Sequence, residues 1–127
     1  MSTSFRLLFS PQRLRNCEIR NRILSTGHQT YLAKGNMPQD DFIAYHEARA
    51  RGGVGLIVNE SARFHESSVG EAPDLTILTD DAIPHYARLA AAVQRHGAKI
   101  FGQLSHSGRV SRRMRFLRTS SASDRAL

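Results

Sequence analysis

The chain has 127 residues, of which 40% are hydrophobic and 23% charged, and its formal net charge is +7. This length suits one domain rather than two, and the composition is ordinary for a soluble globular protein. There is no apolar run long enough to span a bilayer and no apolar signal segment near Met1. The single cysteine, Cys17, excludes an internal disulfide framework and a cysteine metal cluster. We therefore expect a cytoplasmic protein with no membrane partner.

The positive charge is concentrated at the C-terminal end of the chain. Residues 110–127 hold five arginines against a single acid, Asp124, a net charge of +4 that leaves only +3 for residues 1–109. Residues 1–109 therefore give no reason to propose a nucleic-acid surface.

The expected elements begin with a short hairpin. Pro11 predicts a turn, and the apolar positions of residues 14–19 fit two short strands. Residues 22–27 form a β-like run that ends in small side chains, which we interpret as the first core strand. Residues 31–39 contain Gly and Pro and are predicted to form a loop.

A helix is predicted next, over residues 40–51. Two aspartates stand at its start, where acids complement the helix dipole, and two glycines follow its end. Helical spacing places Phe42, Tyr45 and Ala48 on its apolar face. The apolar run 54–58 then predicts a strand that is buried on both sides.

A second helix and a third strand complete the pattern. Residues 63–74 are polar and predict a surface excursion. A helix is expected between Asp81 and Gly97, and an apolar strand from Lys99 follows it. Alternation of strand and helix predicts an α/β fold with a parallel sheet. Either a doubly wound open sheet or the first three units of a (β/α)8 barrel fits, and a complete barrel needs about 250 residues.

Polar residues follow each predicted strand, at 26–31, 59–61 and 103–109. The carboxyl ends of parallel strands are where such folds place their ligand sites. Gln103 offers a donor and an acceptor, which suits a heterocycle edge with C=O beside N–H, although it can also satisfy neighbouring backbone groups. Glu60 directly follows an apolar strand, and a buried acid demands a partner.

Other polar residues in these segments leave alternatives open. His28 and His106 fit packing roles as well as ligand roles, and Arg109 fits either an anion site or an ion pair. Neither Ser105 nor Ser107 lies in a Gly-x-Ser-x-Gly elbow, so no nucleophilic triad is indicated. The six histidines do not show metal-ligand spacing.

Three motifs in this order resemble the Old Yellow Enzyme family of FMN-dependent NAD(P)H:flavin oxidoreductases: residues 21–24, 47–58 and 102–109. The branch that contains 2,4-dienoyl-CoA reductase and trimethylamine dehydrogenase is the most similar. The resemblance covers residues 7–113. It implies an FMN-binding (β/α)8 TIM barrel closed below by an N-terminal hairpin, of which this chain holds the first three units.

The resemblance also implies the function and the site. Hydride would pass from NAD(P)H through FMN to an activated alkene or a related small-molecule acceptor. The family's substrate-activating His/Asn pair, flavin-phosphate residues and iron–sulfur cysteines lie on later strands and have no counterpart here, so no catalytic residue and no iron–sulfur cluster is assigned. The residues expected to contact FMN are Thr26, Gly27, His28, Gln29, Ser61 and Gln103.

The Arg/Ser-rich tail, residues 110–127, lacks Gly, Pro and any strand pattern. We expect the barrel segment to span residues 1–109 and the tail to be disordered or a frame-shift product. Because the chain lacks most of the barrel and the substrate-activating residues, we expect it to be inactive alone. The alternative function is a non-enzymatic basic module that binds nucleic acid or an anionic surface through this tail. Deleting the tail would then abolish a salt-sensitive affinity for nucleic acid.

Overall fold

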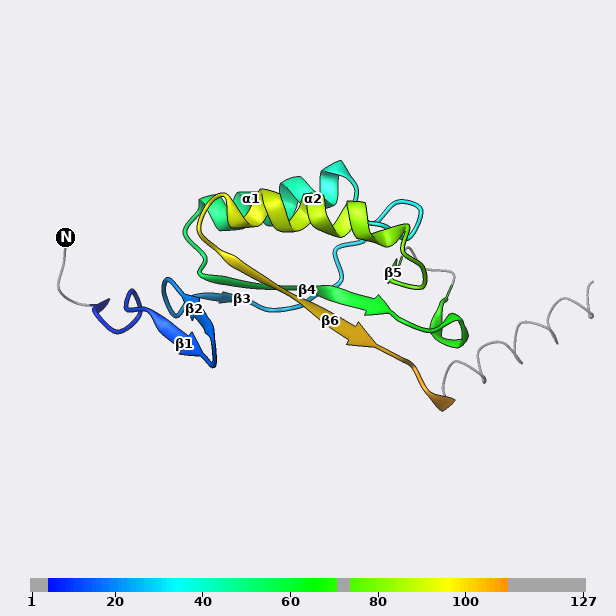
Figure 1. Ribbon diagram of the computed structural model, residues 1–127, viewed down its shortest axis with the longest axis horizontal. Helices are drawn as coiled ribbons and strands as arrows, with labels where there is room; N and C mark the ends of the chain where they lie inside the picture. Colours follow the sequence, from blue (N-terminus) through cyan, green and yellow to red (C-terminus); the bar gives the residue numbers. More distant parts are fainter. Residues whose placement is uncertain (1–4, 71–73, 110–127) are drawn as a thin grey trace, which may run out of the picture.

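The computed structural model describes residues 5–70 and 74–109. The centre of the main sheet is β4 (Leu56–Arg63), which pairs in parallel with β3 (Leu24–Ser25) and with β6 (Lys99–Ser105) (Figure 1). Leu56 and Ile57 pair with both neighbours, so β3 and β6 lie on opposite edges of β4. All three strands therefore end at the same edge of the sheet.

Two helices, α1 (Asp40–Arg51) and α2 (Ala82–Gln94), lie side by side over one face of this sheet (Figure 1). The order β3, α1, β4, α2, β6 confirms the predicted alternation and the parallel sheet. The predicted hairpin is also confirmed, because β1 (Gln12–Leu14) and β2 (Cys17–Ile19) pair in antiparallel. The predicted tail, residues 110–127, lies outside the described residues. No helix in the described ranges is both long and apolar enough to cross a membrane.

The predicted end of the second core strand is wrong. β4 does not stop at Val58 but continues to Arg63, and it pairs there with an unpredicted short strand, β5 (Leu75–Thr76). A register shift between Val58 and Ser61 marks a bulge in the pairing with β6. Asn59 and Glu60 are each only 1% exposed, so they lie inside the buried strand rather than after it. The polar excursion is correspondingly shorter and contains the 3-10 helix η2 (Glu66–Ser68).

The buried face of α1 also differs from the predicted one. Ala48 is exposed and Tyr45 only half-buried, whereas Phe42 and His46 are fully buried. The His46 ring packs against the rings of Phe42 and Tyr45, at centroid distances of 4.6 Å and 5.2 Å respectively. The prediction treats histidine as polar and therefore leaves His46 out of the apolar face. The predicted face is for this reason displaced around the helix from the face that is buried.

His46 should make folding stability depend on pH. Burial lowers its pKa from 6.5 to about 4, and electrostatic interactions with Arg49 and His28 add to this effect. The unfolded chain therefore binds a proton at higher pH than the folded chain, and stability falls as the pH drops from 6.5 towards 4. We expect the free energy of unfolding in urea to fall by about 2 kcal/mol between pH 7 and pH 5.

The matched variant is His46→Leu, which cannot titrate. Neither ring nitrogen of His46 has a hydrogen-bond partner among the described residues, so leucine loses no such bond. The variant should show a much flatter dependence over the same pH range. An equal loss of stability in both proteins would contradict this assignment.

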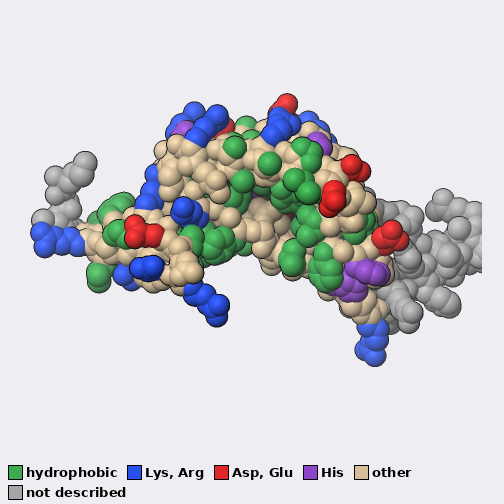
Figure 2. Space-filling model, in the orientation of Figure 1, with side chains coloured by type: hydrophobic (Ala, Val, Ile, Leu, Met, Phe, Trp, Pro, Cys, Tyr) green, Lys and Arg blue, Asp and Glu red, His purple; other side chains and the backbone are tan. Residues whose placement is uncertain are grey.

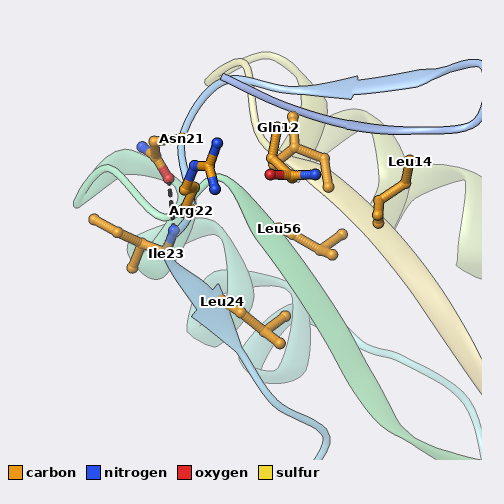
Figure 3. A pocket seen from close by; sticks show the side chains of 8 residues that line it. Gln12, Leu14, Asn21, Arg22, Ile23, Leu24 and Leu56 are labelled. Carbon is orange, nitrogen blue, oxygen red and sulfur yellow. Dashed lines mark hydrogen bonds between the residues drawn. The ribbon is translucent and has the colours of Figure 1, made fainter. Parts of the chain in front are cut away.

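The amino end of the sheet is fixed by Arg20 and Asn21. The Arg20 guanidinium donates to the carbonyl oxygens of His96 at 2.6 Å, Ala50 at 2.8 Å and Val54 at 2.9 Å, which joins the ends of both helices. Below them, the hairpin and the strand starts line an open pocket of about 250 Å³ (Figure 3). It lies at the end of the sheet opposite to the polar strand ends, and it is lined by Gln12, Leu14, Ile19, Asn21, Arg22, Ile23, Leu24 and Leu56.

Candidate functional site

Three segments meet at the carboxyl ends of the parallel strands. Ser61 of β4 is paired in register with Gln103 of β6, whose backbone N–H donates to Oδ1 of Asn59 at 3.3 Å. Gly27 follows β3, and a β-carbon there would lie 3.0 Å from the Asn59 carbonyl oxygen and 3.5 Å from Cδ of Gln103, and closer still to its Oε1. A glycine at position 27 therefore lets the Gln103 carboxamide lie against the backbone.

The Gln103 carboxamide is available to a ligand. Gln103 is exposed, and its side chain has no hydrogen-bond partner within residues 5–70 and 74–109. Its NH2 group and carbonyl oxygen can therefore bind a donor–acceptor pair on a flat ring.

Glu60 anchors the segment that follows β3. Its Oε2 accepts the Thr30 backbone N–H at 2.6 Å and the Thr30 hydroxyl at 2.8 Å. That hydroxyl oxygen in turn accepts the backbone N–H of Leu32 at 3.2 Å. Burial raises the pKa of the Tyr86 phenol on α2 to about 12, and the nearby charge of Glu60 adds to this shift. Thr30 is thus the partner of the buried Glu60. The carboxylate does not face solvent, and it positions the backbone of the segment after β3.

The other predicted contact residues have separate surroundings. His28 Nδ1 donates to the Thr26 carbonyl oxygen at 3.0 Å, so its Nε2 accepts from the Tyr45 hydroxyl and its ring is held against α1. Thr26 itself is exposed. Gln29 donates to Oδ1 of Asp74 at 3.5 Å. The structure therefore brings Gly27, Ser61 and Gln103 together. The other predicted contact residues lie next to Gly27 on the segment after β3, and they are Thr26, His28 and Gln29.

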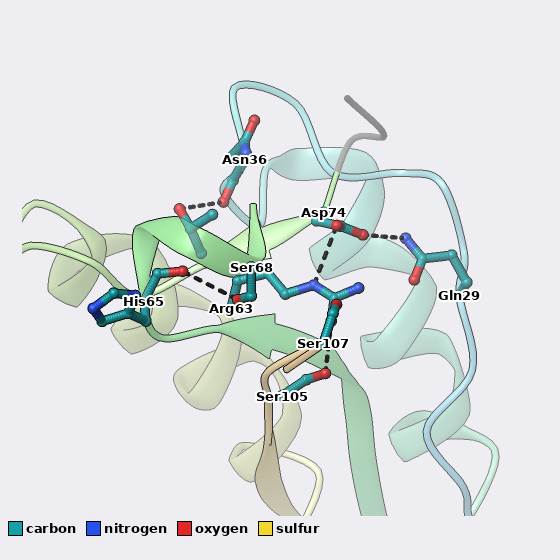
Figure 4. A network of polar contacts seen from close by, with 9 residues as sticks. Gln29, Asn36, Arg63, His65, Ser68, Asp74, Ser105 and Ser107 are labelled. Carbon is teal, nitrogen blue, oxygen red and sulfur yellow. Dashed lines mark hydrogen bonds and ion pairs between the residues drawn. The ribbon is translucent and has the colours of Figure 1, made fainter. Parts of the chain in front are cut away.

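Arg63 forms a polar network that the sequence pattern did not predict (Figure 4). Its Nε pairs with Oδ2 of the buried Asp74 at 3.2 Å, and its Nη1 donates to the hydroxyls of Ser105 at 2.7 Å and Ser107 at 3.3 Å. The network ties the ends of β4 and β6 to the residue before β5. In the sequence, the network is indicated only by the opposite charges of Arg63 and Asp74 at the two ends of the polar segment 63–74.

A model of the NADH:flavin oxidoreductase / NADH oxidase family matches residues 7–126. The chain belongs to this family. The match continues through residues 114–126, beyond the residues 7–113 that carry the resemblance seen in the sequence.

Relatives within the family agree with this assignment. The chain is 38% identical to N,N-dimethylglycine/sarcosine dehydrogenase of Chromohalobacter salexigens over 86% of its length, and 42% identical to NADH oxidase of Thermoanaerobacter brockii over 84%. It spans only 16% and 17% of those two proteins. Among solved structures, the Old Yellow Enzyme homologue of Zymomonas mobilis matches 80% of the chain and 28% of its own, with a TM-score of 0.69 and 27% identity. The fold is therefore the N-terminal part of the (β/α)8 barrel of Old Yellow Enzymes.

The residues present fit the family's cofactor, FMN, for which NAD(P)H is the electron donor. The pyrimidine edge of a flavin carries C=O groups beside N–H, and the exposed Gln103 carboxamide offers the complementary donor and acceptor. Because Gly27 has no side chain, this carboxamide can lie directly against the backbone after β3. The donor and the acceptor of this carboxamide thus suit the edge of a flat heterocycle.

Proposed function

We propose that this chain forms the first three β/α units of an FMN-dependent NAD(P)H oxidoreductase and supplies the side of the FMN site that faces the pyrimidine edge. The observation that carries the proposal is the free Gln103 carboxamide held against Gly27 at the carboxyl ends of β3, β4 and β6. When bound, FMN supplies hydride transfer between NAD(P)H and an activated alkene or a related small acceptor.

The residues of this chain would then bind and position. Gln103 would hydrogen-bond the pyrimidine edge, Ser61 would add a contact from the neighbouring strand, and the segment 26–29 would lie along the ring. Glu60 would keep that segment in place through its two bonds to Thr30. Preorganised hydrogen bonds of this kind tune a flavin without reorganising when it reacts.

We expect the chain alone to bind flavin weakly and therefore to be colourless after purification. The outer edge of β6 has no partner strand in the described part of the chain, and Phe101 and Leu104 are 40% and 65% exposed. An uncovered strand edge and exposed apolar side chains leave the site open to water on that side. We expect no oxidation of NAD(P)H under these conditions.

The test is the affinity for added FMN, measured by quenching of flavin fluorescence. Gln103→Ala should bind FMN about tenfold more weakly than the unchanged chain, because two hydrogen bonds are lost. The matched control is Gln94→Ala at the exposed end of α2, which should bind as the unchanged chain does. Equal affinities for both variants would overturn the role of Gln103.

A further inference from the structure

A groove of about 450 Å³ lies where the segments after β4 and β6 meet, and it is lined by His65, Ser67, His106, Gly108 and Arg109. Figure 2 shows histidine side chains gathered at this end of the molecule. The Phe64 ring lies 5.6 Å from the His106 ring, and the two histidine rings lie 5.8 Å apart. None of the residues just named around the groove carries a carboxylate.

Two backbone amides determine which nitrogen of each histidine carries the proton. The Gly108 N–H donates to His106 Nδ1 at 2.9 Å, and the Ser67 N–H donates to His65 Nδ1 at 3.2 Å. A ring nitrogen that accepts a hydrogen bond is unprotonated. Both neutral rings therefore carry their proton on Nε2.

The hydrogen bonds through Ser67 then have one direction. His106 Nε2–H donates to the Ser67 hydroxyl oxygen at 2.9 Å, and that hydroxyl donates onward to His65 Nδ1 at 2.9 Å. The remaining ring proton, on His65 Nε2, has no acceptor among the described residues, and the Arg109 guanidinium carries only donors. The free donors of the groove are thus the His65 Nε2–H and the Arg109 guanidinium, whereas both histidine Nδ1 lone pairs are already used.

We propose that this groove binds an anionic oxygen group, a phosphate or a carboxylate, between Arg109 and His65. Free N–H donors from a histidine and an arginine match such an acceptor, and arginine pairs with both groups through parallel N–H bonds. A metal ion is disfavoured, because it needs free nitrogen lone pairs and both Nδ1 lone pairs already accept backbone N–H groups. The proposal goes beyond flavin binding and does not depend on it.

The test follows the ring Cε1–H signals of His65 and His106 by NMR at pH 7 while inorganic phosphate or acetate is added to the full chain at constant ionic strength. We expect saturable shifts of both signals, and the anion with the lower dissociation constant identifies the class. Arg109→Gln should weaken that binding about tenfold, the loss of one charge-assisted bond.

The matched control is Arg51→Gln, which removes the same charge from the exposed end of α1, before the start of β4. It should leave the dissociation constant unchanged. Shifts that do not saturate with either anion would overturn the proposal, and so would equal weakening in the two arginine variants, because general screening of the positive charge would then explain the response.

Discussion

Gly55→Ala is expected to lower the free energy of unfolding by about 3 kcal/mol, measured by urea denaturation. A β-carbon at Gly55 would lie 2.7 Å from the Asn21 carbonyl oxygen and 3.0 Å from Cγ2 of Ile19, and closer still to Oδ1 of Asn21. Asn21 cannot easily move away. Its amide donates to the Gly53 carbonyl oxygen at 2.8 Å, and its Oδ1 accepts the Ile23 N–H at 3.1 Å.

Gly102→Ala is the control for this change, because it adds the same methyl group to β6. The nearest atom to a β-carbon at Gly102 is Oδ1 of Asn59 at 3.8 Å, which is ordinary contact. We expect this variant to stay within about 0.5 kcal/mol of the unchanged chain. If both variants lost the same stability, close packing at the start of β4 would not be the cause.

Glu60→Ala is expected to cost about 3 kcal/mol of unfolding free energy and to speed hydrogen exchange at the Thr30 amide. The change leaves the Thr30 N–H and hydroxyl without their acceptor and opens a cavity beside β4. Glu60→Gln keeps an acceptor oxygen, so it should lose about 1 kcal/mol and retain most of the protection of Thr30.

Glu18→Ala serves as the matched control for Glu60→Ala, since Glu18 is exposed on the hairpin. Its removal should change stability by less than about 0.5 kcal/mol and leave the Thr30 amide as protected as before. Unchanged exchange at Thr30 in Glu60→Ala would contradict the positioning role of Glu60, whatever the global stability of the variant.

The arrangement of elements could be predicted because its signals are local. Acids at positions 40 and 41 and the glycines after residue 51 mark a helix that begins and ends as expected, at Asp40 and Arg51. The apolar runs that follow each helix predict the strands, and the polar residues after them predict a ligand site at the edge of the sheet where these strands end. Gln103 stands out within this pattern because it interrupts an apolar strand with an amide.

The remainder depends on contacts between distant residues. Glu60 and Asn59 look like the end of a strand, yet they remain inside β4, where Glu60 Oε2 accepts from Thr30 and Asn59 Oδ1 accepts the Gln103 N–H. Arg63 and Asp74 look like surface residues until the fold brings them together at 3.2 Å. Periodicity in a single sequence does not predict such pairs, because each of these residues considered alone is a polar residue that is expected to be exposed.

The most direct test of the central claim is an NMR titration of the chain with riboflavin, which lacks the phosphate and so leaves the proposed anion-binding groove out of the measurement. The flavin proposal predicts that the Gln103 side-chain NH2 signals and the Gly27 amide shift together and saturate, while the Gln94 side-chain signals stay in place. No shift at Gln103, or equal shifts at Gln103 and Gln94, would contradict the proposal that these strand ends bind the pyrimidine edge of a flavin.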